Sequence, residues 1–123
     1  MINNLKSILF SIAVLGAVAL NAQEAKTISL VQIPEAFETT ELKLEAGKPY
    51  IFEVENNGVD RKVGFVVAPK GQTEQENHVK EAYLKKAISN GETATSEVVT
   101  LEAGEYVYFC PLNPTPRYTL IVE

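Results

Sequence analysis

The chain has 123 residues, of which 46% are hydrophobic, and a formal net charge of −5 at pH 7. Its acidic residues are scattered along the sequence and do not form a block, which argues against a nucleic acid as the partner. This length suits one domain with a modest hydrophobic core.

The first 22 residues have the pattern of a secretory signal peptide. Lys6 precedes an apolar run from Ile8 to Leu20, which is too short and too rich in small residues for a membrane-spanning helix. We expect cleavage after Ala22, which leaves residues 23–123 as the mature domain with a net charge of −6, since Lys6 is the only charged residue removed. We therefore expect an exported protein, periplasmic or secreted, without a membrane span in the mature chain.

The mature chain consists mostly of short strand-like runs separated by turn residues, a pattern typical of an all-β sandwich or barrel. Within 62–68, for example, Val63, Phe65 and Val67 alternate on one face and Val66 lies on the other. The ranges that we expect to be strands are 27–33, 37–44, 50–55, 62–68, 95–101, 106–109 and 118–122.

Residues 72–90 break the strand pattern and predict a helix. Thr73 and Glu76 have the spacing of a capping box, and the dipeptide at 90–91 is Asn-Gly, a typical helix stop. The apolar positions that recur at helical spacing are Val79, Ala82, Tyr83 and Ala87. We expect one helix of about four turns inserted between strands.

Cys110 is the only cysteine, so no disulfide can form within one chain. In an oxidising compartment, a lone thiol is buried, bound to a metal or paired with another chain. We favour burial, because cysteine is among the most buried residue types.

The residues around Cys110 carry a family resemblance. The run Ala103-Gly-Glu-Tyr-Val-Tyr-Phe-Cys110 ends a strand and opens a proline-rich loop at 111–116. This arrangement resembles the copper-binding end of a cupredoxin, the blue-copper Greek-key barrel, and by strand and turn order the resemblance runs from about residue 37 to residue 123. It implies an all-β Greek-key cupredoxin-like sandwich or barrel with one helix inserted between strands.

The resemblance also implies a ligand set that this chain lacks. A blue-copper site needs two imidazoles and a thiolate, often with an axial Met. Asn113 stands where many family members have a His, Tyr118 lies near the expected Met, and Arg61 or Lys62 occupies the region of the first His. The chain has one His, and its only Met is Met1. One chain therefore cannot build this set, and we expect a degenerate copper site.

The remaining candidate residues have ordinary structural interpretations. His78 is interpreted as a solvated residue of the predicted helix, and nothing in the sequence brings it to Cys110 as a nucleophile–base pair, so we expect no enzyme. Tyr106, Tyr108 and Tyr118 are interpreted as core or shallow surface residues. The alternative is an exposed aromatic patch.

Two hypotheses of function remain open. In the first, an exported cupredoxin-like protein has lost blue-copper electron transfer, needs no cofactor and acts as a binding or accessory module. Because the equivalent family loop meets redox partners, the surface that contacts an unknown protein partner would be Pro111, Leu112, Asn113, Pro114 and Pro116. In the second, Cys110 and Asn113 bind copper or another soft metal through a non-standard ligand set, for metal or electron transfer. Both hypotheses fit a monomer or a weak dimer, and fold analogy alone does not establish electron transfer.

Overall fold

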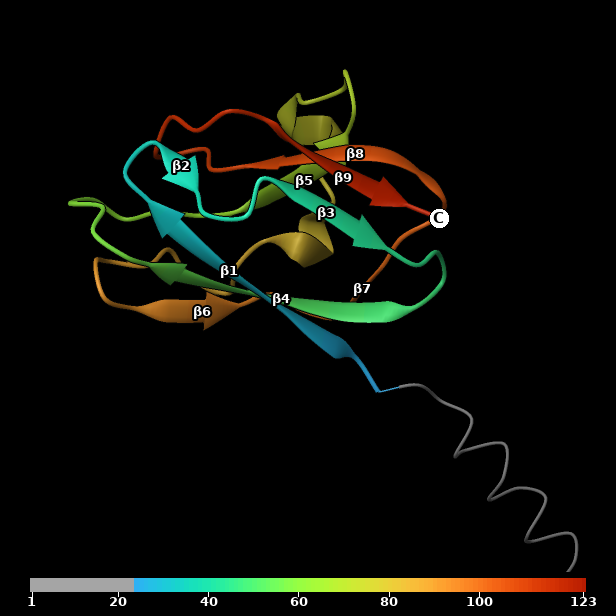
Figure 1. The fold of residues 1–123 in the computed structure, drawn as a ribbon, viewed down its shortest axis with the longest axis horizontal. Coiled ribbons are helices and arrows are strands. Elements are labelled where there is room, and N and C mark those ends of the chain that lie inside the picture. The colour runs from blue at the N-terminus through green and yellow to red at the C-terminus, as the bar shows by residue number, and fades with distance from the viewer. Residues whose placement is uncertain (1–23) are drawn as a thin grey trace, which may run out of the picture.

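The computed structural model describes residues 24–123, which form two β-sheets packed face to face (Figure 1). The predicted signal peptide at 1–22 lies outside the described residues. The first sheet has the strand order β2 (Ala36–Phe37), β1 (Lys26–Ile33), β4 (Pro49–Asn56) and β6 (Thr93–Thr95), and β7 (Val99–Thr100) also pairs with β4. The second sheet has the order β3 (Glu41–Leu44), β9 (Tyr118–Val122), β8 (Gly104–Phe109) and β5 (Val66–Pro69).

Two of the strand pairs are parallel, and both join segments that are distant in sequence. β1 runs parallel to β4, with Leu30 opposite Val54, and β3 runs parallel to β9, with Leu44 opposite Val122. A parallel neighbour needs a crossover connection, since a tight hairpin reverses the chain. The chain therefore passes from the first sheet to the second between β1 and β4, through β2 and β3.

The core lies between the two sheets and is filled by the alternate residues that the sequence pattern indicated. Phe52 and Val54 of β4 and Leu120 of β9 have no exposed surface. Val63, Phe65 and Val67 belong to this core, whereas Val66 is buried outside it, so the predicted alternation in this run is confirmed. The all-β fold predicted from the sequence is thus confirmed.

The four-turn helix predicted at 72–90 is wrong. The structure has two single 3-10 turns in its place, η1 (Gln75–Asn77) and η2 (Lys80–Ala82). The backbone N–H of Val79 donates to the carbonyl of Val67 in β5 (2.8 Å), and that of Lys85 donates to the carbonyl of Thr95 in β6 (3.0 Å). An α-helix would use these N–H groups within itself. Here they bond to the edges of both sheets, and Figure 1 places η2 between the two layers.

Three predicted strands are shorter or divided in the structure. The range 37–44 is split into β2 and β3, because the chain changes its partner from β1 to β9 within this range. The range 95–101 is split into β6 and β7, which pair with separate parts of β4. The predicted strand at 62–68 begins only at Val66. Before this point, Val63 forms an isolated bridge with Ile88, and the N–H of Gly64 points to the sulfur of Cys110.

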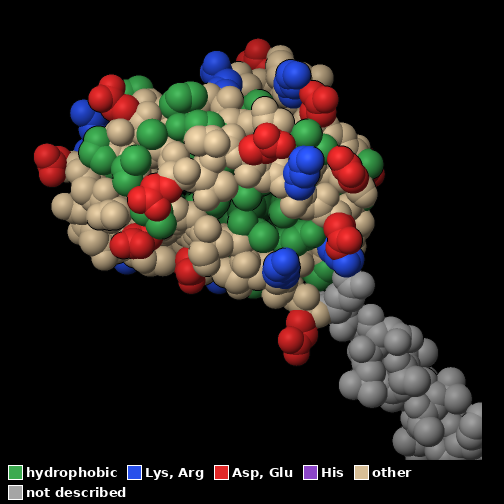
Figure 2. Space-filling model, in the orientation of Figure 1, with side chains coloured by type: hydrophobic (Ala, Val, Ile, Leu, Met, Phe, Trp, Pro, Cys, Tyr) green, Lys and Arg blue, Asp and Glu red, His purple; other side chains and the backbone are tan. Residues whose placement is uncertain are grey.

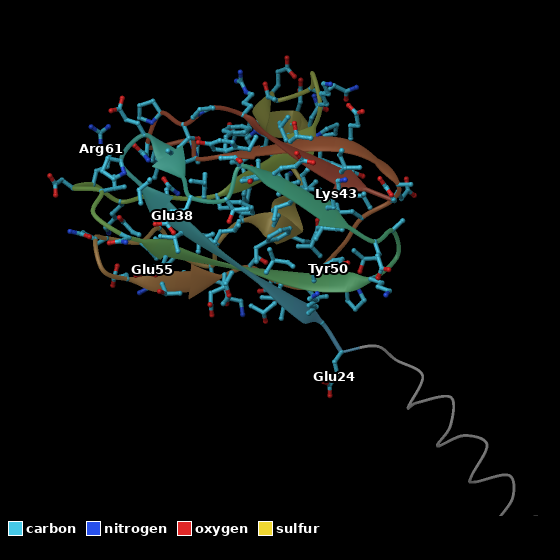
Figure 3. The ribbon with its side chains drawn as sticks, in the orientation of Figure 1. Glu24, Glu38, Lys43, Tyr50, Glu55 and Arg61 are labelled. Carbon is cyan, nitrogen blue, oxygen red and sulfur yellow. The ribbon has the colours of Figure 1, made fainter. Side chains whose placement is uncertain are left out.

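Charged side chains are distributed over the surface. Figure 2 shows acidic and basic side chains interspersed on the face that it displays. Glu55, labelled in Figure 3, is exposed, and its neighbour Glu53 is half-buried and accepts a hydrogen bond from the Ser29 hydroxyl (3.1 Å). Within residues 24–123, no helix is long and apolar enough to cross a membrane.

Candidate functional site

Cys110 follows the last residue of β8, the strand that lies between β5 and β9 in the second sheet. Its side chain is 4% exposed, so the predicted burial is confirmed. The loop 111–116 leaves β8 here and returns to β9. In Figure 1 this loop lies at the same end of the molecule as the turn between β1 and β2.

The sulfur of Cys110 is the centre of a group of backbone hydrogen bonds. It accepts from the N–H groups of Gly64 (3.4 Å), Leu112 (3.4 Å) and Asn113 (3.2 Å). The backbone N–H of Cys110 itself donates to the hydroxyl of Thr115 (3.1 Å), which closes the loop on its own first residue. The thiol therefore holds together the loop and the segment ahead of β5.

Asn113 is 3% exposed, and its side-chain amide is fully engaged. The Nδ2 group donates to Oε1 of Gln32 (3.0 Å) and to the carbonyl of Ile33 (3.2 Å). The Oδ1 atom accepts from the N–H of Glu35 (3.1 Å). Asn113 thus links the cysteine loop to the end of β1 and to the turn that follows it.

Gln32 is the residue of this site that sequence reasoning missed. It has no exposed surface, and its Nε2 group donates to the carbonyl of Gly64 (3.2 Å) while its Oε1 accepts from Asn113. The sequence pattern could have identified Gln32. Side chains two residues apart in a strand point to the same face, so Gln32 points inward as Leu30 does. A polar residue at an inward position of a strand needs a polar partner inside the protein.

The other positions that the resemblance placed near a metal lie elsewhere. Arg61 is exposed at the loop end of the molecule, as Figure 3 shows, and its Nη1 lies 3.5 Å from the carbonyl of Leu112. Lys62 is also exposed. The hydroxyl of Tyr118 accepts from the N–H of Phe37 (3.2 Å), and its ring packs edge-on against the Phe37 ring, so this side chain is bound to β2 and packs against the core.

His78 is not the solvated helix residue that the sequence predicted. It is half-buried at the end of η1, and both of its ring nitrogens have partners. Nε2 lies 2.9 Å from the carbonyl of Thr73, and Nδ1 lies 2.7 Å from the hydroxyl of Tyr83. A carbonyl can only accept, so Nε2 is the donor in its contact with Thr73.

The three tyrosines do not form the exposed aromatic patch that was the alternative interpretation. Tyr108 is fully buried and donates its hydroxyl proton to the carbonyl of Thr39 (2.5 Å). Tyr106 and Tyr118 are half-buried. Burial raises the pKa of Tyr108 above the usual range, and the nearby Tyr118 and Glu41 raise it further. The prediction that they are core or shallow surface residues is confirmed.

The donor set around Cys110 does not fit a blue-copper centre, which needs two imidazoles beside the thiolate. The amide that takes the place of one imidazole, that of Asn113, uses both its oxygen and its nitrogen in hydrogen bonds to protein groups. The imidazole of His78 is bound to Thr73 and Tyr83. Within the described range 24–123, no cluster of three or more His, Cys, Asp or Glu side chains is arranged to hold a metal ion.

The outer surface of the loop is apolar and accessible. The side chain of Leu112 is 48% exposed, and the three loop prolines, Pro111, Pro114 and Pro116, are exposed. Beside them is an open cavity of about 290 Å³, lined in part by Pro114 and Arg61. The predicted contact surface also included Asn113, but this residue is 3% exposed and lies beneath the outer side of the loop.

Comparisons with known proteins agree with this architecture. A family model described as a cupredoxin-like domain matches residues 6–122. Auracyanin B is similar in structure, with a TM-score of 0.68 and 19% identity over 84% of this chain and 92% of that chain. A search of the curated proteins found no match.

Two further solved structures show the same likeness of fold. Auracyanin A, a "blue" copper protein from the bacterium Chloroflexus aurantiacus, has a TM-score of 0.67 and 20% identity over 81% of this chain and 100% of that chain. An azurin from the obligate methylotroph Methylomonas sp. strain J has a TM-score of 0.60 and 16% identity over 81% of this chain and 99% of that chain.

Proposed function

Because the chain belongs to the cupredoxin-like family, whose model matches nearly its whole length, we propose that it is an exported binding or accessory module that has lost blue-copper electron transfer. The observation that carries this proposal is the engagement of Asn113. Its amide stands in the cysteine loop where many family members have an imidazole, and it bonds to Gln32, Ile33 and Glu35. In this proposal, position 113 holds the loop in place through hydrogen bonds and does not bind a metal.

The contact surface of this module is the outer side of the loop, formed by Pro111, Leu112, Pro114 and Pro116. Leu112 supplies exposed apolar area, and the three prolines restrict the backbone that carries it. A rigid surface loses little conformational freedom on binding, which favours association. The partner is a protein with a complementary apolar surface, and no catalytic step is assigned to the module.

Copper binding at Cys110 is the second candidate function. The observation in its favour is that three backbone N–H groups hold the sulfur, a soft donor, in one position within the loop. Asn113 is the residue that would join Cys110 as a ligand. To do so, its amide would give up hydrogen bonds to Gln32, Ile33 or Glu35. Such a site would be weak.

A copper titration of the mature domain, residues 23–123, tests the loss of blue copper. Visible absorption and melting temperature are recorded under reducing and oxidising conditions, for the natural chain and for Cys110→Ser. We expect no intense thiolate-to-copper absorption band and an unchanged melting temperature. An intense band that disappears in Cys110→Ser would overturn the proposal in favour of metal binding.

Capture from a periplasmic extract tests the contact surface separately. Leu112→Ala removes the exposed apolar side chain of the loop and should weaken retention of a partner on the immobilised domain. The matched control is Val98→Ala, which trims a side chain of similar exposure, 50% against 48%, in the connection between β6 and β7. Equal retention by the two variants would contradict a contact role for the loop.

A further inference from the structure

Four residues close a ring of hydrogen bonds under the loop 111–116, which we call the amide clasp: Gln32, Gly64, Cys110 and Asn113. Gln32 Nε2 donates to the carbonyl of Gly64, and the N–H of Gly64 points to the sulfur of Cys110. The N–H of Asn113 also points to this sulfur, and its Nδ2 group donates to Gln32 Oε1. Each member of the ring therefore contacts two others.

The amide clasp joins three segments that are far apart in sequence. Gln32 belongs to β1 in the first sheet, Gly64 lies ahead of β5, and Cys110 and Asn113 belong to the loop after β8. Gln32 and Asn113 are 0% and 3% exposed, so neither amide can exchange its protein partners for water unless the loop opens. A buried polar group that loses its partner is strongly unfavourable.

Backbone strain next to the clasp is an independent observation. Glu35 has a φ of 61°, and it is the only residue other than glycine with a positive φ in the described range 24–123. Its N–H donates to Oδ1 of Asn113 (3.1 Å). Strain of this kind persists only where surrounding contacts fix the conformation, and it is common at functional sites. Here the turn is fixed by the pairing of β1 with β2 and by a contact from the loop, the hydrogen bond to Asn113.

We propose that the amide clasp is the element that positions the loop surface for its partner, with Gln32 as the positioning residue. The clasp joins the cysteine loop, which connects two strands of the second sheet, to β1 of the first sheet and to the segment ahead of β5 through hydrogen bonds. Pro111, Leu112 and Pro114 flank its members, so closing the clasp sets the conformation of all three. This inference rests on the proposed function only for what the loop binds, because the positioning itself is a property of the isolated domain.

Labelling of Cys110 by a thiol reagent under native conditions measures the opening of the clasp. The thiol is 4% exposed, so it reacts only when the loop opens or the whole domain unfolds. Gln32→Leu removes both hydrogen bonds of the Gln32 carboxamide and keeps a side chain of similar size. We expect Gln32→Leu to raise the labelling rate about tenfold or more beyond what its loss of global stability explains. A change of about tenfold corresponds to the free energy lost with a buried hydrogen bond.

The matched control is Ser96→Ala, which removes a buried polar group elsewhere in the protein. Ser96 is 1% exposed and accepts from the N–H of Phe52 (3.0 Å) in the first sheet, outside the clasp. Urea denaturation gives the global stability of each variant. The labelling rate of Cys110 in Ser96→Ala should change only as far as the global stability of that variant changes. If the rate for Gln32→Leu also follows global stability alone, the proposal is overturned.

Amide hydrogen exchange of the natural chain gives a second measurement, which holds even if Gln32→Leu does not fold. The N–H groups of Glu35, Gly64 and Asn113 all bond to members of the clasp. We expect them to exchange through one shared opening that is easier than global unfolding. Unrelated opening free energies would overturn the proposal. Neither measurement needs a partner, so failure of the clasp is distinguishable from failure of the proposed function.

Discussion

At the scale of single residues, Glu35 occupies a position that suits glycine. It follows Pro34 in the turn between β1 and β2, and its φ of 61° is the conformation that a type II turn requires at its third residue. Replacing it by glycine removes the steric cost of the left-handed conformation, which exceeds the added chain entropy of glycine. We expect Glu35→Gly to raise the free energy of unfolding by about 0.5–1 kcal/mol.

The control for this prediction is Glu55→Gly. Glu55 is an exposed residue inside β4, where glycine should lower the free energy of unfolding by about 0.5–1 kcal/mol. Urea denaturation of both variants gives the comparison. A loss of stability in Glu35→Gly as large as that in Glu55→Gly would contradict the strain argument.

Tyr108 gives a prediction of pH dependence. Burial raises its pKa in the folded protein, while in the unfolded chain a tyrosine ionises at about pH 10. Below this pH both states keep the proton, and the stabilisation by Tyr108 is fully present. Between this pH and the raised pKa only the unfolded state loses the proton, so the free energy of unfolding falls by about 1.4 kcal/mol per pH unit.

Tyr108→Phe removes this ionisation and keeps the buried ring. The stability difference between the natural chain and Tyr108→Phe should therefore be constant below about pH 10 and should shrink above it. Urea denaturation at a series of pH values measures this difference. A difference that does not change with pH would show that Tyr108 ionises equally well in both states.

The cysteine site shows what single residues reveal before a structure exists. The position of Cys110 at the end of a strand, and its burial, were predictable from the apolar run before it and from the properties of cysteine. The role of Asn113 was not, because a buried amide and an exposed loop amide look alike in sequence. The inward position of Gln32 could have been predicted from its alternation with Leu30, but its partners could not, and the pairing of β1 with β4 places it opposite the equally buried Asn56.

At the scale of elements, residues 72–90 show where sequence periodicity misleads. Val79, Ala82 and Tyr83 have helical spacing, but the same spacing serves two short turns that carry the chain between sheet edges. The capping-box spacing of Thr73 and Glu76 does not distinguish a helix from two short turns, because no side chain caps η1 in the structure. The strands were more predictable, because alternation over five or more residues needs no knowledge of the distant partner.

Substitutions at two alanines distinguish the predicted helix from the structure observed at residues 72–90. In the predicted helix, Ala82 and Ala87 would both belong to the apolar stripe, at its two edges, whereas in the structure Ala82 is fully buried and Ala87 is exposed. We therefore expect Ala82→Leu to destabilise the fold by about 1–3 kcal/mol through overpacking. Ala87→Leu should change stability by no more than about 0.5 kcal/mol. Thermal unfolding measures both, and similar losses would favour the helix.

At the scale of the whole molecule, stability depends on aromatic contacts between the two sheets. Phe52 of the first sheet packs against Phe65, with ring centroids 5.0 Å apart, and Phe65 packs against Tyr108 of the second sheet. Phe37 joins the same cluster edge-on. Because these rings fill the space between the layers, neither sheet keeps its core without the other.

Phe52→Ala should therefore cost about 3–5 kcal/mol, a large part of the stability of a typical domain. Chemical denaturation followed by far-ultraviolet circular dichroism and by tyrosine fluorescence measures the loss. The two signals should change together in the natural chain, since both sheets share one core. The exposed Val98 serves as the control, and Val98→Ala should stay within about 0.5 kcal/mol of the natural chain.

The parallel pairing of β3 with β9 has a consequence for the time course of folding. β9 lies between β3 and β8 in its sheet, so β3 has no strand partner in the second sheet until the chain has been made as far as Tyr118–Val122. Contacts between such distant segments must first overcome the entropy of closing a long loop. We expect refolding on the millisecond-to-second timescale typical of all-β domains, with the second sheet completed only when β9 docks.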